Sequence, residues 1–172
     1  MLIFALSILF GSIVGLALGL MAWNIGDMMF GKATFSFKGL MFMIAFAIVF
    51  DGKYLILSDG SEYLSFYEPK DFKFVKKVAV FDNLGAVSSL NELEFVNGFV
   101  YANIYQTDKI VKINPNNGKI VATIDFTGLL PEDLSSGVDV LNGIAWNPST
   151  EHFYITGKLW PRLYEVRLYY KE

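Results

Sequence analysis

The sequence predicts an all-β protein: a partial β-propeller of about three blades that follows an N-terminal hydrophobic helix. Two observations lead to this expectation. The chain divides sharply in composition, because residues 1–50 contain three charged side chains and residues 51–172 contain the other 28 of 31. The second part also repeats a pattern of short apolar segments and turns at offsets of 46 and 53 residues. Repeats of about 40–50 residues with several short strands per unit are typical of propellers.

The N-terminal part of the chain is apolar enough to enter a membrane. Residues 1–26 contain no charged side chain, and about 20 apolar residues in a helix cross a hydrocarbon core of about 30 Å. A cleaved signal peptide is the competing interpretation, but it requires a positive residue before the apolar run and a small-residue cleavage site. No Lys or Arg precedes the run. We therefore expect an uncleaved membrane anchor, with the body of the protein on the extracytoplasmic side.

An apolar connector follows the predicted anchor. Residues 27–50 carry the only charges of the front part, and Gly39–Phe50 is a run of twelve uncharged residues. Twelve residues are short for a membrane span, and a buried strand is equally compatible with this composition. The structure of this connector stays open at the level of sequence.

The repeats of residues 51–172 predict β-strands joined by turns. The segment that starts at Asp51 matches the segment that starts at Asn97, and the latter matches the segment at His152. Each unit contains β-branched and aromatic residues between Asn-, Asp- and Gly-rich turns, which is typical of short strands. At about 40–45 residues per blade, 122 residues hold fewer than three blades, whereas propellers close with about 4–8. Open edges of this kind favour pairing with another chain, so self-association is expected.

The composition excludes several kinds of function. The chain has no cysteine and one histidine, so thiolate catalysis and zinc sites built from Cys or several His are excluded. A net charge of −3 and a pI near 5.2 provide no basic field for nucleic acid. We therefore expect no metal, no cofactor and no nucleic-acid partner.

Four strings in the second part resemble one known family. They are Phe50–Ser61, Leu90–Leu130, Asp139–Trp146 and Thr156–Val166, and they are similar to the plant and bacterial type of glutaminyl-peptide cyclotransferase. The resemblance implies a five-bladed β-propeller that converts an N-terminal glutamine to pyroglutamate with release of ammonia. It implies no zinc, and substrates that are peptides or proteins with an N-terminal Gln.

The resemblance also implies three substrate-binding residues. Asn91 matches an asparagine of the family's pocket, and Lys158, in the string Thr-Gly-Lys-Leu-Trp-Pro, matches a pocket lysine. Tyr105 stands where the family usually has a tryptophan, so it keeps an aromatic wall of a different size. Without the resemblance, each residue reads as an ordinary turn or surface residue.

The catalytic residue cannot be assigned from the sequence. The family's acid/base glutamate lies in a Glu-Ser-Thr-Gly-Leu-type string of an earlier blade, and no such string occurs here. Glu92 or a carboxylate from a partner chain is the substitute, and Glu94 is expected on the same side of its strand as Glu92. Two functions follow: a cyclotransferase-like enzyme, or a non-catalytic, membrane-tethered fragment that acts as a binding module or is inactive.

Overall fold

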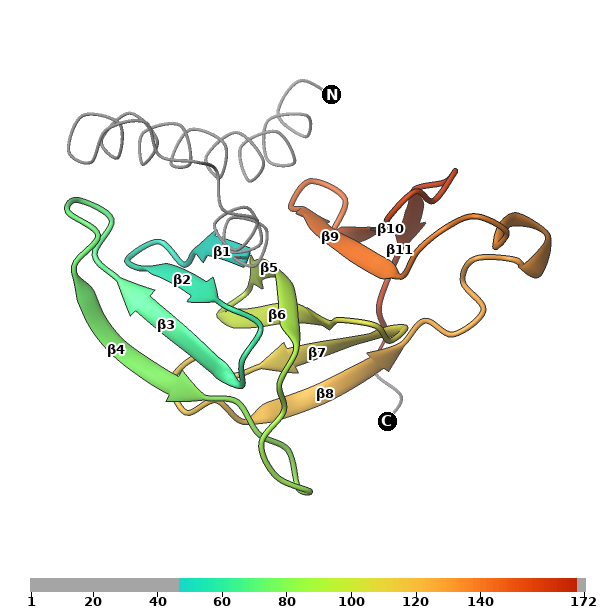
Figure 1. The fold of residues 1–172 in the computed structure, drawn as a ribbon. Helices are drawn as coiled ribbons and strands as arrows, with labels where there is room; N and C mark the ends of the chain where they lie inside the picture. The colour runs from blue at the N-terminus through green and yellow to red at the C-terminus, as the bar shows by residue number, and fades with distance from the viewer. Residues whose placement is uncertain (1–46, 170–172) are drawn as a thin grey trace, which may run out of the picture. The chain divides into compact units, whose positions relative to one another are not determined.

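A computed structural model of the chain describes residues 47–169, which form three antiparallel sheets (Figure 1). The all-β prediction is therefore confirmed for this part. The predicted anchor at residues 1–26 and the connector up to residue 46 lie outside the described residues. Among residues 47–169, no helix has the length and apolar composition needed to cross a bilayer. The last four residues of the connector form a strand, so the first sheet begins before residue 51.

Each sheet is a meander of strands that pair with their neighbours in the sequence. The third sheet has three strands within the described residues, and the first two have four each. The strands of the first sheet are β1 (Ala47–Phe50), β2 (Leu55–Ser58), β3 (Tyr63–Tyr67) and β4 (Phe74–Ala79); those of the second are β5 (Leu90–Val96), β6 (Phe99–Ile104), β7 (Lys109–Ile113) and β8 (Ile120–Asp125); those of the third are β9 (Leu141–Asn147), β10 (His152–Gly157) and β11 (Tyr164–Val166).

The 46-residue repeat governs pairing within the first two sheets. Register shifts occur between Phe66 and Tyr67 in the first sheet and between Lys112 and Ile113 in the second, 46 residues later. The predicted unit began at the second strand of each sheet, and the structure adds a strand before it in each case: β1, β5 and β9. The repeat comparison began at the turn before each second strand, so it did not include β1, β5 or β9.

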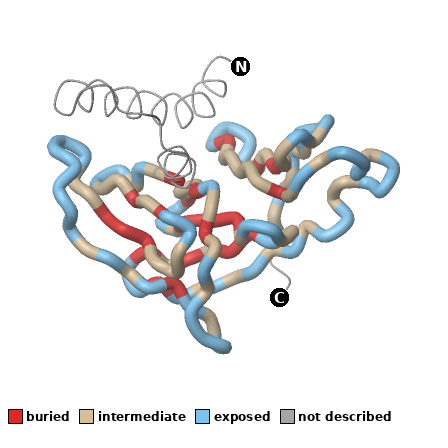
Figure 2. Tube along the Cα trace, viewed as in Figure 1, coloured by how far each residue is buried: buried red, intermediate tan, exposed pale blue. Residues whose placement is uncertain are grey.

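The second sheet lies between the other two, because β5 contacts β1 on one side and β9 on the other. Side chains alternate along β6 accordingly: Val100 and Ala102 pack toward the first sheet, and Tyr101 packs against Phe153 of the third. Two apolar clusters result, and Figure 2 shows the buried residues concentrated in the strands, with exposed residues at the turns. A strand buried on both faces reads as a continuous apolar run, as β6 does.

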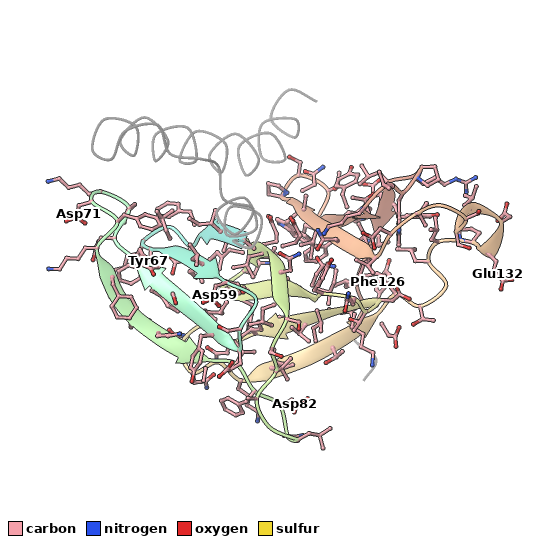
Figure 3. All side chains as sticks on the ribbon, in the orientation of Figure 1. Asp59, Tyr67, Asp71, Asp82, Phe126 and Glu132 are labelled. Atoms are coloured by element: carbon pink, nitrogen blue, oxygen red, sulfur yellow. The ribbon has the colours of Figure 1, made fainter. Side chains whose placement is uncertain are left out.

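The long connection between the second and third sheets contains a short 3₁₀ helix, Glu132–Leu134, which Pro131 precedes. Figure 3 shows Glu132 on this peripheral connection and Asp71 on the outer turn between β3 and β4. Both carboxylates therefore lie away from the junctions between the sheets.

Candidate functional site

The candidate site lies at one end of the second and third sheets. In an antiparallel meander, the end where one strand begins is the end where the next strand finishes. Asn91 and Asn142 are the second residues of β5 and β9, and Tyr105 and Lys158 follow directly after β6 and β10. The two pairs of elements thus deliver four polar or aromatic side chains to the same end of the two sheets.

The turn after the second strand shares one backbone feature in all three sheets. Its second residue adopts a left-handed conformation in each case, with φ of 81° at Gly60, 65° at Gln106 and 61° at Leu159. The residue before this left-handed position directly follows the strand, and it is Tyr105 in the second sheet and Lys158 in the third. Left-handed φ is uncommon for residues other than glycine and costs about 1 kcal/mol or more. The two turns that carry the candidate residues are therefore the strained ones.

A pair of asparagines joins β5 of the second sheet to β9 of the third sheet, and we call these first strands of the sheets the inner strands. The Nδ2 of Asn91 donates to the Oδ1 of Asn142 at 2.5 Å. The Nδ2 of Asn142 donates in turn to Oε1 of Glu92 at 3.4 Å, a long hydrogen bond. Asn142 thus contacts two consecutive residues of β5.

A β-bulge explains how consecutive residues reach the same partner. A regular strand would direct Asn91 and Glu92 to opposite faces. In β5 the register shifts between Asn91 and Leu93, so Glu92 is the extra residue, with a left-handed φ of 45°. Bulges of this kind re-aim side chains. Glu92 and Glu94 lie on the same side of β5, as expected, because Glu92 contacts Asn142 and Glu94 accepts from Trp146, both in β9.

The surroundings of Glu92 shift the pKa of its carboxyl group upward. Its carboxylate is reachable by solvent, yet enough protein surrounds it that desolvation raises the pKa of Glu92. The positive charge of Lys158 and the hydrogen bond from Asn142 act in the opposite direction on that pKa. A carboxylate whose pKa is shifted toward neutrality can both accept and donate a proton.

Lys158 and Tyr105 form the other half of the site. The Nζ of Lys158 lies 4.7 Å from the centre of the Tyr105 ring, a cation–π contact. Backbone hydrogen bonds hold both residues: the N–H of Tyr105 donates to the carbonyl of Ser89 at 2.8 Å, and that of Lys158 donates to Val140 at 3.0 Å. Lys158 therefore makes two interactions: its ammonium group contacts the ring of Tyr105, and its positive charge lowers the pKa of Glu92.

Two further polar side chains lie in the same junction, Glu94 half-buried and Asn103 fully buried. The pKa of Glu94 is raised to about 7 because its carboxylate is desolvated, although the backbone N–H of Trp146 donates to it. Asn103 is fully buried, and neither atom of its amide has a hydrogen-bond partner among the described residues. Its Cα pairs with that of Asn91 across the sheet. Buried polar groups without partners are rare and costly.

The structure brings together all three substrate-binding candidates, Asn91, Tyr105 and Lys158, although they come from three separate segments of the chain. Glu92 joins them as the nearby carboxylate. The sequence analysis missed Asn142, and the signal was present: Leu141-Asn142-Gly143 repeats Leu90-Asn91-Glu92 after 51 residues. Residues 47–169 contain no group of three or more His, Cys, Asp or Glu side chains that could hold a metal ion.

Comparisons with known proteins point to one family. A family model described as glutamine cyclotransferase matches residues 43–168. The glutaminyl-peptide cyclotransferase of Arabidopsis thaliana is 42% identical over 121 residues, which are 69% of this chain and 38% of that protein. The crystal structure of Myxococcus xanthus glutaminyl cyclase matches with a TM-score of 0.66 and 38% identity, over 72% of this chain and 54% of that chain. The resemblance predicted from the sequence strings is confirmed, and the chain spans about half or less of each relative.

Proposed function

This chain belongs to the glutamine cyclotransferase family, and from that premise we propose that its site cyclises an N-terminal glutamine of a peptide or protein to pyroglutamate. The observation that carries the proposal is the meeting of Asn91, Glu92 and Lys158 at one end of two sheets, with Tyr105 beside the lysine. A cation, a carboxylate, an amide and an aromatic wall are the groups that this reaction requires.

The reaction is an intramolecular acyl transfer. The α-amino nitrogen attacks the side-chain amide carbon, a C–N bond forms, and the original amide nitrogen leaves as ammonia. The substrate supplies much of the proximity itself, so the site has to hold one rotamer and exclude others. The ring of Tyr105 provides a wall for the aliphatic stem of the glutamine.

Two charged groups perform the proton transfer and the charge stabilisation. The ammonium of Lys158 faces the developing oxyanion of the tetrahedral intermediate, and preorganised donors of this kind contribute strongly to catalysis. The carboxylate of Glu92 accepts a proton from the attacking amine and returns it to the leaving nitrogen. Its raised pKa suits both steps. Glu92 thereby takes the role of the family glutamate whose string is absent from this sequence.

The experiment is to incubate the purified full chain with a fluorogenic peptide that begins with Gln, and to measure ammonia release. We expect Lys158→Ala and Asn91→Ala each to lower kcat/KM by about 100-fold or more. Lys70→Ala, on an exposed turn, is the matched control for the loss of a lysine. A peptide whose α-amine is acetylated should release no ammonia. Absence of turnover by the wild-type chain at every concentration would overturn the proposal.

A binding module is the second candidate, favoured by the 38% and 54% of its relatives' lengths that the chain spans. In that case the site recognises an N-terminal glutamine without converting it. Calorimetric binding of the same peptide without ammonia release would identify this function. Binding that Lys158→Ala abolishes would place it at the same site.

We also propose that residues 1–26 anchor the protein in a membrane, with the body on the extracytoplasmic side. Their lack of charge supports the anchor. The test is whether the protein stays in the membrane pellet at alkaline pH, and whether external protease cleaves the body of intact cells. Release into the soluble fraction would contradict the anchor.

Self-association is proposed for the open edge of the third sheet. Within the described residues, β11 pairs with β10 only, so one side of this strand carries no strand partner. Two copies that pair through such edges would cover them. Sedimentation of the detergent-solubilised chain should show a dimer or larger species, and a monomer at all concentrations would contradict it.

A further inference from the structure

Asn142 occupies an unusual place in the site, because its two amide atoms serve two consecutive residues of the neighbouring sheet. Its Oδ1 accepts from the Nδ2 of Asn91 at 2.5 Å, and its Nδ2 donates to Glu92 at 3.4 Å. The bonds run in one direction, from Asn91 through Asn142 to the Glu92 carboxylate. Hydrogen bonds in such a chain polarise one another.

The carboxylate determines the direction of this chain. An ionised carboxylate only accepts hydrogen bonds, so it requires the NH₂ end of the Asn142 amide. The oxygen of Asn142 then faces Asn91 and requires the NH₂ end of that amide. The opposite orientation would place the oxygen of Asn142 against the oxygen of Glu92, which is repulsive. The side-chain oxygen of Asn91 is therefore the atom that remains for a ligand.

This orientation has a chemical consequence for recognition. The oxygen of an amide accepts hydrogen bonds and donates none. A ligand group placed against Asn91 must then carry N–H donors, as the α-amino group of a peptide does. If the Asn91 amide were reversed, its NH₂ group would face the ligand and would disfavour an amine or ammonium group.

The backbone supports the same arrangement at some cost. Glu92 has a left-handed φ of 45° and is the extra residue of a bulge, which a non-glycine residue adopts only with strain. At the corresponding place of β9 the residue is Gly143, where an added Cβ would lie 2.7 Å from Cγ2 of Thr156. The two inner strands thus share the Leu-Asn pair but differ at the next position, where only the second sheet carries a carboxylate.

We propose that Asn142 is a positioning residue: its side-chain amide links the Glu92 carboxylate to Asn91 and thereby turns the oxygen of Asn91 toward the α-amino group of the substrate. The identity of that substrate rests on the proposed function above. The hydrogen-bond chain itself involves residues of this chain only, so it can be tested with and without turnover.

The test uses two variants of the full chain with matched controls. Asn142→Leu removes both hydrogen bonds at similar volume. Asn142→Asp keeps an acceptor for Asn91 but replaces the donor to Glu92 by a like charge. Asn116→Leu and Asn116→Asp make the same chemical changes in the exposed turn after β7. The melting temperature of each variant shows whether it folds, and the aspartate variant is the one that preserves shape and polarity.

The first measurement is the titration of the Glu92 side-chain carboxyl carbon by NMR. Loss of a hydrogen bond to a carboxylate raises its pKa, and a nearby negative charge raises it further. We expect the titration midpoint of Glu92 to rise by about 0.5–1 unit in Asn142→Leu and by more in Asn142→Asp. The Asn116 variants should leave it unchanged. A purely structural role of Asn142 would lower the melting temperature without moving this midpoint.

The second measurement separates KM from kcat for the Gln-initiated peptide. We expect Asn142→Leu to raise KM about tenfold, because Asn91 is no longer held in its acceptor orientation. Asn142→Asp should raise KM less than threefold where Glu92 is ionised, and should move the acidic limb of the pH–rate profile to higher pH. An unchanged Glu92 midpoint in both folded variants would overturn the inference. If the wild-type chain never cyclises glutamine but the midpoint moves, the hydrogen-bond chain is supported and the proposed function alone fails.

Discussion

The second sheet buries both of its faces, one against the first sheet and one against the third, and the two junctions differ in chemistry. At the first junction, the buried hydroxyl of Ser58 is satisfied, because its Oγ donates to the carbonyl of Leu90 at 2.7 Å. At the second junction lie the Asn91–Asn142 pair, the half-buried Glu94, and Asn103, whose amide has no partner among the described residues. Each junction also contains a cluster of buried apolar side chains.

The comparison shows where this molecule departs from optimal packing. Ser58 and Asn103 are both buried polar residues on the second strands of their sheets, but among the described residues only the side chain of Ser58 has a hydrogen-bond partner. The turn after Ser58 contains a glycine at its left-handed position, whereas the turns beside the site contain Gln106 and Leu159. Violations of local preference tend to concentrate at functional sites. The unpaired amide and the left-handed residues at the second junction are therefore expected to lower the free energy of unfolding, and they lie beside the polar site.

The largest expected effect concerns the first junction, at Gly118. This residue has a φ of 77°, and an added Cβ would lie 1.8 Å from the carbonyl oxygen of Ala79. Because that atom belongs to the backbone, it cannot move aside easily, and Gly118→Ala should lower the free energy of unfolding by more than about 3 kcal/mol. Urea denaturation measures it.

The matched control is Gly98→Ala. Gly98 has a similar φ of 83°, but nothing lies within 4 Å of an added Cβ. This variant should cost only about 1–2 kcal/mol, the price of a left-handed residue alone. Equal losses in the two variants would show that the close approach between the first and second sheets contributes nothing.

The second prediction concerns the pH dependence of the second junction. Glu94 has a folded-state pKa of about 7, above the 4.5 of the unfolded chain. The native state therefore binds more protons than the unfolded state between these values, and this group's contribution to stability falls as the pH rises from 4.5 to 7. The loss amounts to about 2–3 kcal/mol and is complete above pH 7.

Glu94→Gln should remove this dependence, because the amide oxygen still accepts from Trp146 and carries no charge. The variant should be more stable than wild type at pH 8 and similar to it at pH 5, as measured by denaturation at the two pH values. Identical pH profiles for the two proteins would contradict the assignment to Glu94.

The third prediction compares the two buried polar side chains on the second strands. Asn103→Leu removes an amide that has no partner and fills a similar volume, so it should raise the free energy of unfolding by about 1 kcal/mol. Ser58→Ala removes a satisfied hydrogen bond and should lower it by about the same amount. Thermal denaturation decides the signs. A destabilised Asn103→Leu would show that the Asn103 amide has a partner in solution.

The smallest expected effect lies in the turn after Lys158. Leu159 is 78% exposed and has a φ of 61°, so Leu159→Gly relieves a left-handed strain without removing buried surface. The gain should be about 0.5–1 kcal/mol, reduced by the greater entropy of glycine in the unfolded chain. Gln106→Gly is the corresponding change in the second sheet. A melting temperature that falls in both variants would argue against stored strain in these turns.

Much of the fold was predictable because it depends on local chemistry. The 46-residue offset predicted the strands and turns of two sheets, since Asn, Asp and Gly set hairpin turns wherever they occur. The repeat comparison did not predict the inner strands β5 and β9. The bulge at Glu92 cannot be recognised from the hydrophobic pattern of the sequence. These features arise from packing between sheets, which a single segment does not contain.

The sequence by itself determined the family, the all-β class, and the identity of Asn91, Tyr105 and Lys158 as site candidates, because these follow from strings of neighbouring residues. Only the tertiary structure decided that Asn142 joins them, that Glu92 is re-aimed to the same face, and that Glu94 stays apart against Trp146. The physical reason is that hydrogen bonds and desolvation act between segments about 50 residues apart. Their strength depends on how closely two sheets approach, and no local pattern encodes that distance.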